Sequence, residues 1–226
     1  MAHLIAIEGI DGSGKGTQSK RLVETLCESG HRVGFMGFPR YSETFFGARV
    51  GDFLNGRFGE LWDLPPFLIS LLFAGDRLES RSKLLEQLEG HDLVILDRYV
   101  GSNMAHQSAR CSDAERREVQ DWIEHVEFEI HQMPKPTLNI LLDLPVATAQ
   151  EFVLKKAARD YTSQAADLQE ADAKYLSKVR ETYLDLANRS ANWEVISVAG
   201  DAGTRSIDSV AADILATINN LLGPSP

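Results

Sequence analysis

The stretch EGIDGSGKGTQ, residues 8–18, follows a short apolar run and precedes a pattern of helix-forming residues. Glycines at positions 9, 12 and 14 allow the backbone to turn its N–H groups inward around an anion. The first turn of the helix adds a partial positive charge, and Lys15 extends an ammonium group from the same place. This spacing between a strand and a helix predicts a cradle for nucleotide phosphates and, with it, an α/β fold.

One position departs from the usual form of such a cradle. The residue after the lysine is normally a Ser or Thr that reaches a magnesium ion, and here it is Gly16. Thr17 comes one residue too late to take that position. A magnesium ion would then be held mainly by nucleotide oxygens and by water, which magnesium retains readily. Phosphoryl transfer would remain possible with less dependence on a ligand from the loop.

The composition is typical of a soluble globular protein with room for one ample core. The chain has 226 residues, of which 43% are hydrophobic and 25% charged, and a formal net charge of −10. Such acidity disfavours general nucleic-acid binding, and the apolar runs are too short to span a bilayer. Cys27 and Cys111 are expected to be unpaired thiols of a reducing compartment. We expect a cytoplasmic protein with one domain over residues 1–222 and a short disordered tail over 223–226.

Near-continuous apolar runs alternate along the chain with helical patterns. The predicted strands cover residues 3–8, 33–38, 92–97, 137–143 and 194–198. The predicted helices cover residues 15–29, 66–89, 112–131, 146–158, 171–187 and 207–222. This alternation predicts a parallel sheet, on which ligands bind at the carboxyl ends of the strands.

Two further motifs stand where predicted strands end. Asp97-Arg98-Tyr99 closes the third strand, where P-loop proteins carry a carboxylate that organises magnesium. Arg98 is then placed to contact a second phosphate, and Arg40, in the motif Phe38-Pro39-Arg40-Tyr41, closes the second strand in the same way. Both motifs are also compatible with simple turns, in which Asp97 pairs with Arg98 to cap a helix and Arg40 lies on the surface.

Phe73 and Arg77 are four residues apart in the predicted helix 66–89 and therefore share one face. An aromatic ring and a guanidinium one turn apart can stack on a base and donate hydrogen bonds to it. The spacing alone favours the simpler interpretation, a core phenylalanine beside a salt-bridged arginine.

Three cations, Lys155, Lys156 and Arg159, lie between two predicted helices and before a polar stretch. They are consistent with a mobile lid over residues 155–168 that brings positive charge to a transferring phosphoryl group. A solvated helix end with basic residues that complement the helix dipole is the competing interpretation.

Two sets of phosphate-seeking residues, 9–15 and Arg40 with Arg98, thus lie at strand ends of one sheet, which predicts a nucleoside monophosphate kinase. The chain resembles the thymidylate kinases, which transfer the γ-phosphoryl group of ATP to dTMP. The resemblance runs from about residue 4 to about residue 221 and is carried by IEGIDGSGKGTQ, FPRY, LLFAGDR, DRYVGSNMAHQ and YLSKVRETYLDLA. It implies an α/β, three-layer P-loop NTPase fold, with a five-stranded parallel sheet of order 2-3-1-4-5, flanking helices and a small lid.

The resemblance also implies roles for matching residues. The ATP site would comprise Gly9, Ile10, Asp11, Gly12, Ser13, Gly14, Lys15, Gly16 and Thr17. The dTMP contacts would be Asp11 with the 3′-hydroxyl, Arg40 and Arg98 with the phosphate, Pro39 with the C5 methyl, Phe73 with the ring face, Arg77 with a base carbonyl, Asn103 with the pyrimidine edge and His106 near the 2′ position. Asp97 would organise Mg²⁺ through water, and the catalytic set would be Lys15, Asp97, Arg98 and Arg159.

The sequence departs from the family pattern at the cradle and the lid. Some members carry a catalytic arginine where this chain has Gly12, so we expect Arg159 of the lid, with Lys155 or Lys156 as alternatives, to supply that charge. The Gly16 position resembles adenylate kinases. The family is commonly homodimeric, and the apolar face of residues 66–73 is a plausible contact.

Other functions remain open at this stage. A kinase for dUMP, UMP or CMP differs from a dTMP kinase by contacts that support only about 10–200-fold selectivity for a methyl group. A nucleotide-binding module without transfer would hold ATP and produce no ADP. A GTPase-type switch would need an Asn-Lys-x-Asp stretch, which the sequence does not contain.

Overall fold

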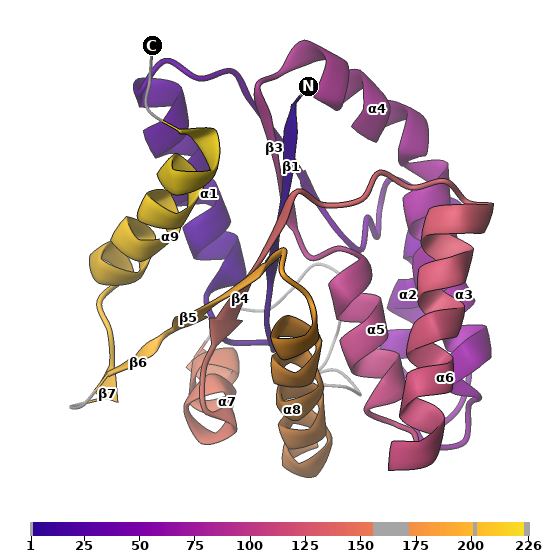
Figure 1. The fold of residues 1–226 in the computed structure, drawn as a ribbon. Helices are drawn as coiled ribbons and strands as arrows, with labels where there is room; N and C mark the ends of the chain where they lie inside the picture. The colour runs from indigo at the N-terminus through magenta and orange to yellow at the C-terminus, as the bar shows by residue number, and fades with distance from the viewer. Residues whose placement is uncertain (1, 156–171, 201–202, 224–226) are drawn as a thin grey trace.

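We describe a computed structural model of the chain, covering residues 2–155, 172–200 and 203–223 (Figure 1). Five strands form one sheet in the order β2-β3-β1-β4-β5, and every neighbouring pair is parallel. The strands are β1 (His3–Glu8), β2 (Val33–Gly37), β3 (Leu93–Asp97), β4 (Leu138–Asp143) and β5 (Trp193–Ser197). The predicted α/β class and the strand order implied by the family resemblance are confirmed.

Helices cover both faces of the sheet (Figure 1). The helices are α1 (Lys15–Glu28), α2 (Phe45–Leu54), α3 (Pro66–Glu79), α4 (Arg81–Gly90), α5 (Val100–Ser108), α6 (Asp113–Glu124), the π-helix η1 (His125–Ile130), α7 (Val146–Lys155), α8 (Ala173–Arg189) and α9 (Ile207–Leu222). A two-stranded antiparallel ribbon, β6 (Ala199–Gly200) with β7 (Gly203–Thr204), lies between β5 and α9.

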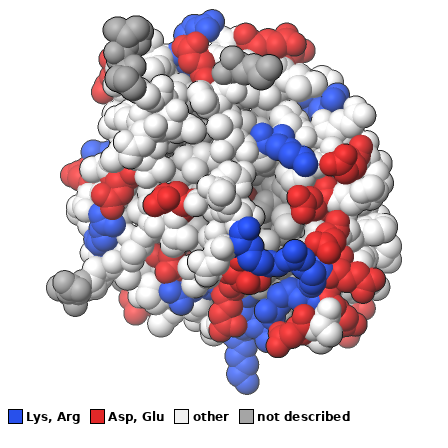
Figure 2. All heavy atoms as spheres, viewed as in Figure 1, with Lys and Arg blue, Asp and Glu red and all other residues white. Residues whose placement is uncertain are grey.

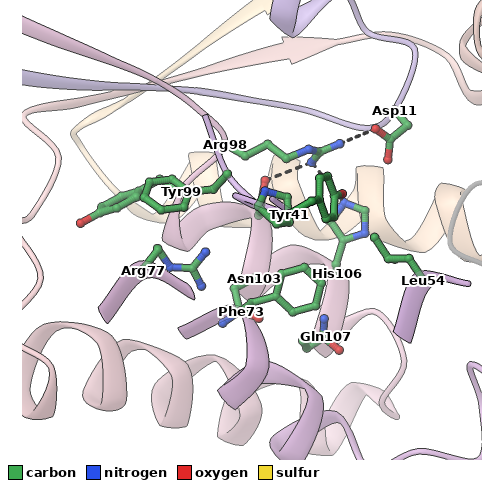
Figure 3. A pocket seen from close by; sticks show the side chains of 13 residues that line it. Asp11, Tyr41, Leu54, Phe73, Arg77, Arg98, Tyr99, Asn103, His106 and Gln107 are labelled. Atoms are coloured by element: carbon green, nitrogen blue, oxygen red, sulfur yellow. Dashed lines mark hydrogen bonds and ion pairs between the residues drawn. The ribbon is translucent and has the colours of Figure 1, made fainter. Parts of the chain in front are cut away.

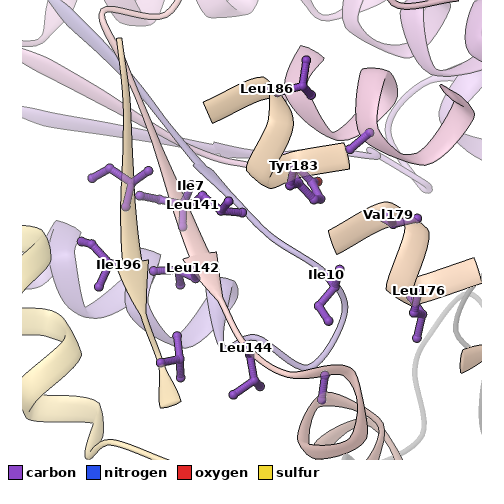
Figure 4. Close-up of a cluster of buried hydrophobic side chains, with 14 of the residues drawn as sticks. Ile7, Ile10, Leu141, Leu142, Leu144, Leu176, Val179, Tyr183, Leu186 and Ile196 are labelled. Carbon is purple, nitrogen blue, oxygen red and sulfur yellow. The ribbon is translucent and has the colours of Figure 1, made fainter. Parts of the chain in front are cut away.

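Alternation along β1 divides the core into two clusters. Ile5 and Ile7 face α1 and α9, whereas Leu4 and Ala6 face α4 and α6, and all four side chains are buried. Successive side chains of a strand point to opposite faces, so a central strand with four consecutive apolar residues joins both layers. Figure 4 shows part of the first cluster, where β4 and β5 meet α8. This double burial holds the loop that follows β1 in place.

Two predicted helices are each divided in the structure. The predicted helix 66–89 is α3 followed by α4, with Ser80 at the junction, where its hydroxyl donates to the backbone oxygen of Asp76 at 2.8 Å. Such back-bonding by serine bends helices. The predicted helix 112–131 is α6 followed by η1. The predicted single helices were therefore wrong in these two places.

Helices α2 and α5 were not predicted. The helix α5 has no apolar stripe because it buries polar side chains, among them Asn103, His106 and Gln107, toward the site described below. Amphipathic periodicity, which reveals surface helices, is therefore absent.

Acidic and basic side chains are both spread over the face shown in Figure 2. Lys and Arg side chains gather on this face around α8 and toward α6. Among the described residues, no helix combines the length and apolar character needed to cross a membrane.

Candidate active site

The glycine-rich loop after β1 forms the cradle that the sequence predicts. Gly14 adopts φ +90° at the start of α1, and the Nζ atom of the buried Lys15 donates to the backbone oxygen of Ile10 at 2.8 Å. Burial, followed by the nearby Arg98 charge, lowers the pKa of Lys15 to about 8. The hydroxyl of Ser13 is buried without a partner among the described residues. The loop thus holds a buried cation and an unpaired hydroxyl at the helix start, as an anion site requires.

The loop packs tightly against α7. Gly12 has φ +86°, and a Cβ atom added there would lie 2.2 Å from the backbone oxygen of Ala149. A side chain at position 12 therefore requires both a strained backbone and movement of α7. An arginine of the kind that some thymidylate kinases carry inside the loop cannot be accommodated here without that movement.

Gly16 brings the cradle close to the end of β3. A Cβ atom at Gly16 would lie 3.2 Å from the Oδ2 atom of Asp97, a tight but adjustable approach. A carboxylate therefore lies next to the position where other such loops carry a Ser or Thr side chain. Asp97 thus lies beside the cradle, at the position where the sequence predicts a carboxylate that organises magnesium.

Arg98 connects the cradle to a neighbouring pocket. It adopts φ +66°, and its backbone N–H donates to the oxygen of Ile7 at 3.0 Å. Its Nη2 atom donates to Oδ1 of Asp11 at 2.6 Å, and its Nη1 atom donates to the oxygen of Gly9 at 3.2 Å and to Oγ of Ser102 at 3.1 Å. These three partners fix the guanidinium between the glycine-rich loop and the neighbouring pocket.

The pocket encloses about 480 Å³ of empty space, part of which is open to solvent (Figure 3). The lining residues are Asp11, Phe38, Pro39, Tyr41, Leu54, Phe73, Arg77, Arg98, Tyr99, Ser102, Asn103, His106 and Gln107. Seven of the eight residues predicted to contact dTMP therefore lie together around one cavity.

Arg40 is the exception. Its Nη1 atom donates to Oγ of Ser80 at 3.0 Å, its Nη2 atom contacts the carboxylate of Glu43, and it does not line the pocket. The predicted phosphate contact of Arg40 would require this guanidinium to leave both partners.

Three side chains at one end of the pocket present hydrogen-bonding groups in fixed orientations. Nδ2 of Asn103 donates to the oxygen of Ser70 at 3.0 Å, which leaves its Oδ1 atom buried without a partner among the described residues. Oε1 of Gln107 accepts from Arg110 at 2.9 Å. The Nε2 atom of Gln107 is buried and has no partner within the residues that the structure describes. Arg77 supplies a third group, with its Nε and Nη2 atoms bonded to Glu127.

His106 forms a neutral wall of the pocket. Its Nδ1 atom lies 3.0 Å from the hydroxyl of Tyr175, which itself donates to the His106 backbone oxygen at 3.1 Å. Burial, followed by the nearby Arg98 charge, lowers the pKa of His106 to about 3. Because the Tyr175 hydroxyl proton is already used, Nδ1 carries the imidazole proton and Nε2 faces Arg98 as an acceptor.

The predicted lid residues fall outside the description. Helix α7 ends at Lys155, whose side chain is not described, and Lys156 and Arg159 lie in the undescribed segment 156–171. The role of Arg159 and the lid boundaries 155–168 remain predictions.

These observations can be compared with known proteins. The family model described as thymidylate kinase matches residues 7–214. The chain belongs to the thymidylate kinase family. A thymidylate kinase of Mycobacterium tuberculosis strain H37Rv is 32% identical over 213 residues, which cover 93% of this chain and 99% of the relative. A probable thymidylate kinase of Saccharolobus solfataricus is 37% identical over 201 residues, covering 89% of this chain and 91% of the relative. A solved thymidylate kinase from Candida albicans has the same fold, with a TM-score of 0.74 and 24% identity over 97% of this chain and 92% of its own.

Several residues of this thymidylate kinase site were not assigned from the sequence. Tyr41, Ser102 and Gln107 line the pocket, although Tyr41 and Ser102 stand inside motifs that the sequence analysis quoted. Gln107 could have been found from its spacing, because it lies four residues after Asn103 on α5 and so shares its face. Buried Glu127, which contacts both Arg77 and Asn103, gives no local signal in the sequence.

Proposed function

We propose that this protein transfers the γ-phosphoryl group of ATP to dTMP and forms ADP and dTDP. The observation that supports this proposal best is the Arg98–Asp11 connection, which links the pocket to the phosphate cradle. A triphosphate in the cradle and a monophosphate in the pocket would meet at Arg98. Membership in the thymidylate kinase family agrees with this arrangement.

The base end of the pocket supports a pyrimidine with an imide edge. Three residues that line the pocket carry the relevant groups: Arg77 and Gln107 offer donors, and Oδ1 of Asn103 offers an acceptor. Thymine and uracil present the complementary acceptors O4 and O2 on either side of the N3–H donor. Cytosine would oppose a donor to Arg77 and an acceptor to Asn103, which leaves buried polar groups unpaired. The ring of Phe73 would stack on the base, and Pro39 would pack against its C5 methyl.

In the proposed reaction, an oxygen of the acceptor phosphate attacks the γ-phosphorus in line. A new P–O bond forms as the bond to the β–γ bridging oxygen breaks, and the electron pair leaves on ADP. The acceptor phosphate is already ionised at neutral pH, so the transfer needs no general base. Lys15 would neutralise charge on the donor phosphates, and Arg98 would orient the acceptor phosphate. The lid cation, for which Arg159 is the candidate, would complete the set.

The residues beside the cradle fit a magnesium ion. Asp97 supplies a carboxylate next to Gly16, and no group of three or more His, Cys, Asp or Glu side chains suited to a metal occurs in the part of the chain that the structure describes. A single carboxylate suits Mg²⁺, which keeps waters and takes phosphate oxygens as ligands. When bound, Mg²⁺ would neutralise charge on the donor phosphates. Asp97 would hold it through water.

We further propose that the protein works as a homodimer in the cytoplasm. Leu68 of α3 and Trp122 of α6 are large apolar side chains, 61% and 40% exposed, and the Phe67 ring packs against Trp122 at 5.7 Å between centroids. Apolar side chains gathered in this way are typical of contact surfaces. Light scattering after gel filtration would test the dimer, and the monomer mass would contradict it.

The activity is tested by ADP release with Mg-ATP and each of dTMP, dUMP, UMP, dCMP and AMP at matched concentration. Fast turnover with dTMP alone supports the proposal. Equal rates with dUMP or UMP would indicate that Pro39 and His106 do not discriminate, and would establish a broader imide-pyrimidine kinase. ATP binding without any acceptor-dependent ADP would contradict the proposed transfer and favour a nucleotide-binding module.

A further inference from the structure

Glu127 is a fully buried carboxylate behind the base end of the pocket. It lies in η1, has no exposed surface, and is not one of the residues that line the cavity. A buried charge is costly unless it is paired and hydrogen-bonded. Its partners therefore indicate what the carboxylate does.

Both base-reading residues contact this one carboxylate. Nε of Arg77 donates to Oε1 and Oε2 of Glu127, each at 2.9 Å, and Nη2 of Arg77 also contacts Oε1. Nδ2 of Asn103 donates to Oε1 of Glu127 at 3.2 Å. Arg77 and Glu127 are 2% and 0% exposed as side chains, so water does not screen the pair.

The carboxylate and the Ser70 oxygen together fix the orientation of the Asn103 amide. Two acceptors, Oε1 of Glu127 and the backbone oxygen of Ser70, converge on the same Asn103 atom. Only the amide nitrogen can donate to both, because an ionised carboxylate and a carbonyl accept alone. The Oδ1 atom of Asn103 is thereby directed away from Glu127, and it is the atom that remains buried and unpaired.

Glu127 also orients the guanidinium of Arg77. Burial by itself would lower the pKa of Arg77, but the charge and hydrogen bonds of Glu127 raise it. With Nε and Nη2 engaged on Glu127, the planar fork is fixed, and its Cζ atom lies 6.0 Å from the centroid of the Phe38 ring in the cavity wall.

Glu127 lies on the buried face of the helix that leads into η1. Val119, Gln120 and Ile123 of α6 are buried, and Val126 and Glu127 continue this face at spacings of three and four residues. The carboxylate thus stands in the π-helix η1, a kind of turn that occurs frequently at functional sites.

We propose that Glu127 is a positioning residue that sets the donor–acceptor order of the base site, so that the site accepts thymine or uracil and rejects 4-aminopyrimidines such as cytosine. This inference rests on the proposed function. The carboxylate acts through Arg77 and Asn103 and does not touch the base. With the Ser70 oxygen it would hold the Asn103 acceptor toward N3–H, and its ion pair would hold the Arg77 fork so that a donor meets O4, which opposes cytosine at both atoms.

The test replaces Glu127 by Gln and measures kcat and KM for dTMP, dCMP and ATP in the full chain. A glutamine lacks the charge that pairs with Arg77, and its amide nitrogen can oppose the donors of both Arg77 and Asn103, so the Arg77 fork is released and Asn103 is held by the Ser70 oxygen alone. We expect the KM for dTMP to rise at least about 10-fold and the preference of kcat/KM for dTMP over dCMP to fall at least about 30-fold. The KM for ATP should change by less than about 3-fold, because the cradle is untouched.

Two further variants separate positioning from general support of the fold. Glu129→Gln changes an exposed glutamate of the same turn, which pairs with Lys135 at 3.6 Å, and should leave all three substrates unaffected. Glu127→Asp retains an acceptor-only group and should preserve the dTMP preference even if its KM rises. Equal losses with dTMP and dCMP in both Glu127 variants would overturn the proposal and assign Glu127 to folding alone.

The test also distinguishes this inference from the proposed function. If the unaltered protein produced no ADP with dTMP, the proposed transfer would fail. Calorimetric binding of dTMP and dCMP to the unaltered chain and to Glu127→Gln would still measure the base preference. Retention of the full preference by Glu127→Gln in that assay would overturn the role of Glu127.

Discussion

The guanidinium of Arg98 donates to the carboxylate of Asp11 at 2.6 Å and thereby ties the end of β3 to the phosphate cradle after β1. The side chains are 14% and 23% exposed, so the ion pair is partly shielded from water. Arg98 also reaches Gly9 and Ser102, which makes it the junction between the two nucleotide sites. Its geometry therefore has consequences for turnover as well as for binding.

Replacing Arg98 by Lys should impair acceptor use more than ATP binding. A lysine keeps the charge but cannot bond Asp11, Gly9 and Ser102 together, because it lacks the planar fork. We expect kcat/KM for dTMP to fall about 100-fold, or about 2.7 kcal/mol, with ATP binding changed less than about 3-fold. Arg32→Lys is the control, because Arg32 pairs with Asp92 at 2.6 Å on the exposed surface. Steady-state kinetics of both variants measure these effects. Similar values of kcat/KM for dTMP in Arg98→Lys and Arg32→Lys would contradict the role of Arg98 between the two nucleotide sites.

ATP binding should take up protons near pH 8. The free cradle lowers the pKa of Lys15 to about 8, and phosphates beside it would raise that pKa. Near pH 8 the free lysine is about half protonated, so binding should capture roughly half a proton, and at pH 6.5 almost none. Calorimetry in buffers of different ionisation enthalpy measures this number. A proton count that is unchanged between the two pH values would contradict the buried position of Lys15.

Folding stability should fall in acid partly because of His106. The folded state lowers the pKa of this imidazole to about 3, whereas the unfolded chain protonates it near the ordinary histidine pKa of 6.5. The unfolded state therefore binds more protons between these values, and stability is lost as pH falls through 6.5. The groups around the ring are Arg98, Asp11, Lys15 and Tyr175.

The measurement compares the unaltered protein with His106→Gln by urea unfolding at pH 7 and pH 5. Between these conditions the unaltered protein should lose about 2 kcal/mol more than the variant. Equal losses would mean that the ring is protonated in the folded state at pH 5.

Adding a methyl group at Gly12 should destabilise the protein through α7. The new Cβ atom would lie 2.2 Å from the oxygen of Ala149, and φ is +86°. Gly12→Ala should therefore cost roughly 3 kcal/mol of unfolding free energy, from strain and overpacking together. Gly30→Ala is the matched control, because Gly30 has φ +89° and no atom within 4 Å of the added Cβ, and it should cost about 1 kcal/mol. Equal urea midpoints for the two variants would show that α7 does not pack on the loop.

Much of this protein was determined by local sequence. Strands β1 to β5 are short continuous apolar runs, and residues 9–15 carry their glycines at the spacing that a phosphate cradle needs. Such signals lie within a few residues of one another, because strand burial and loop curvature depend on neighbouring side chains. The strand-end motif likewise indicated Arg98, whereas Phe73 was assigned to the site only through the family resemblance, because its spacing alone favours the core.

The tertiary structure alone decided the orientation of the site. The Nδ2 atom of Asn103 donates to Glu127 and to the Ser70 oxygen, which are 24 and 33 residues away in sequence. These two bonds leave the Oδ1 atom of Asn103 as the acceptor without a partner among the described residues. Arg40 turns instead toward Ser80 and Glu43, which no strand-end motif could reveal. The direction of a polar side chain depends on partners from distant elements, so a sequence can name the residue while only the packed fold sets what it presents.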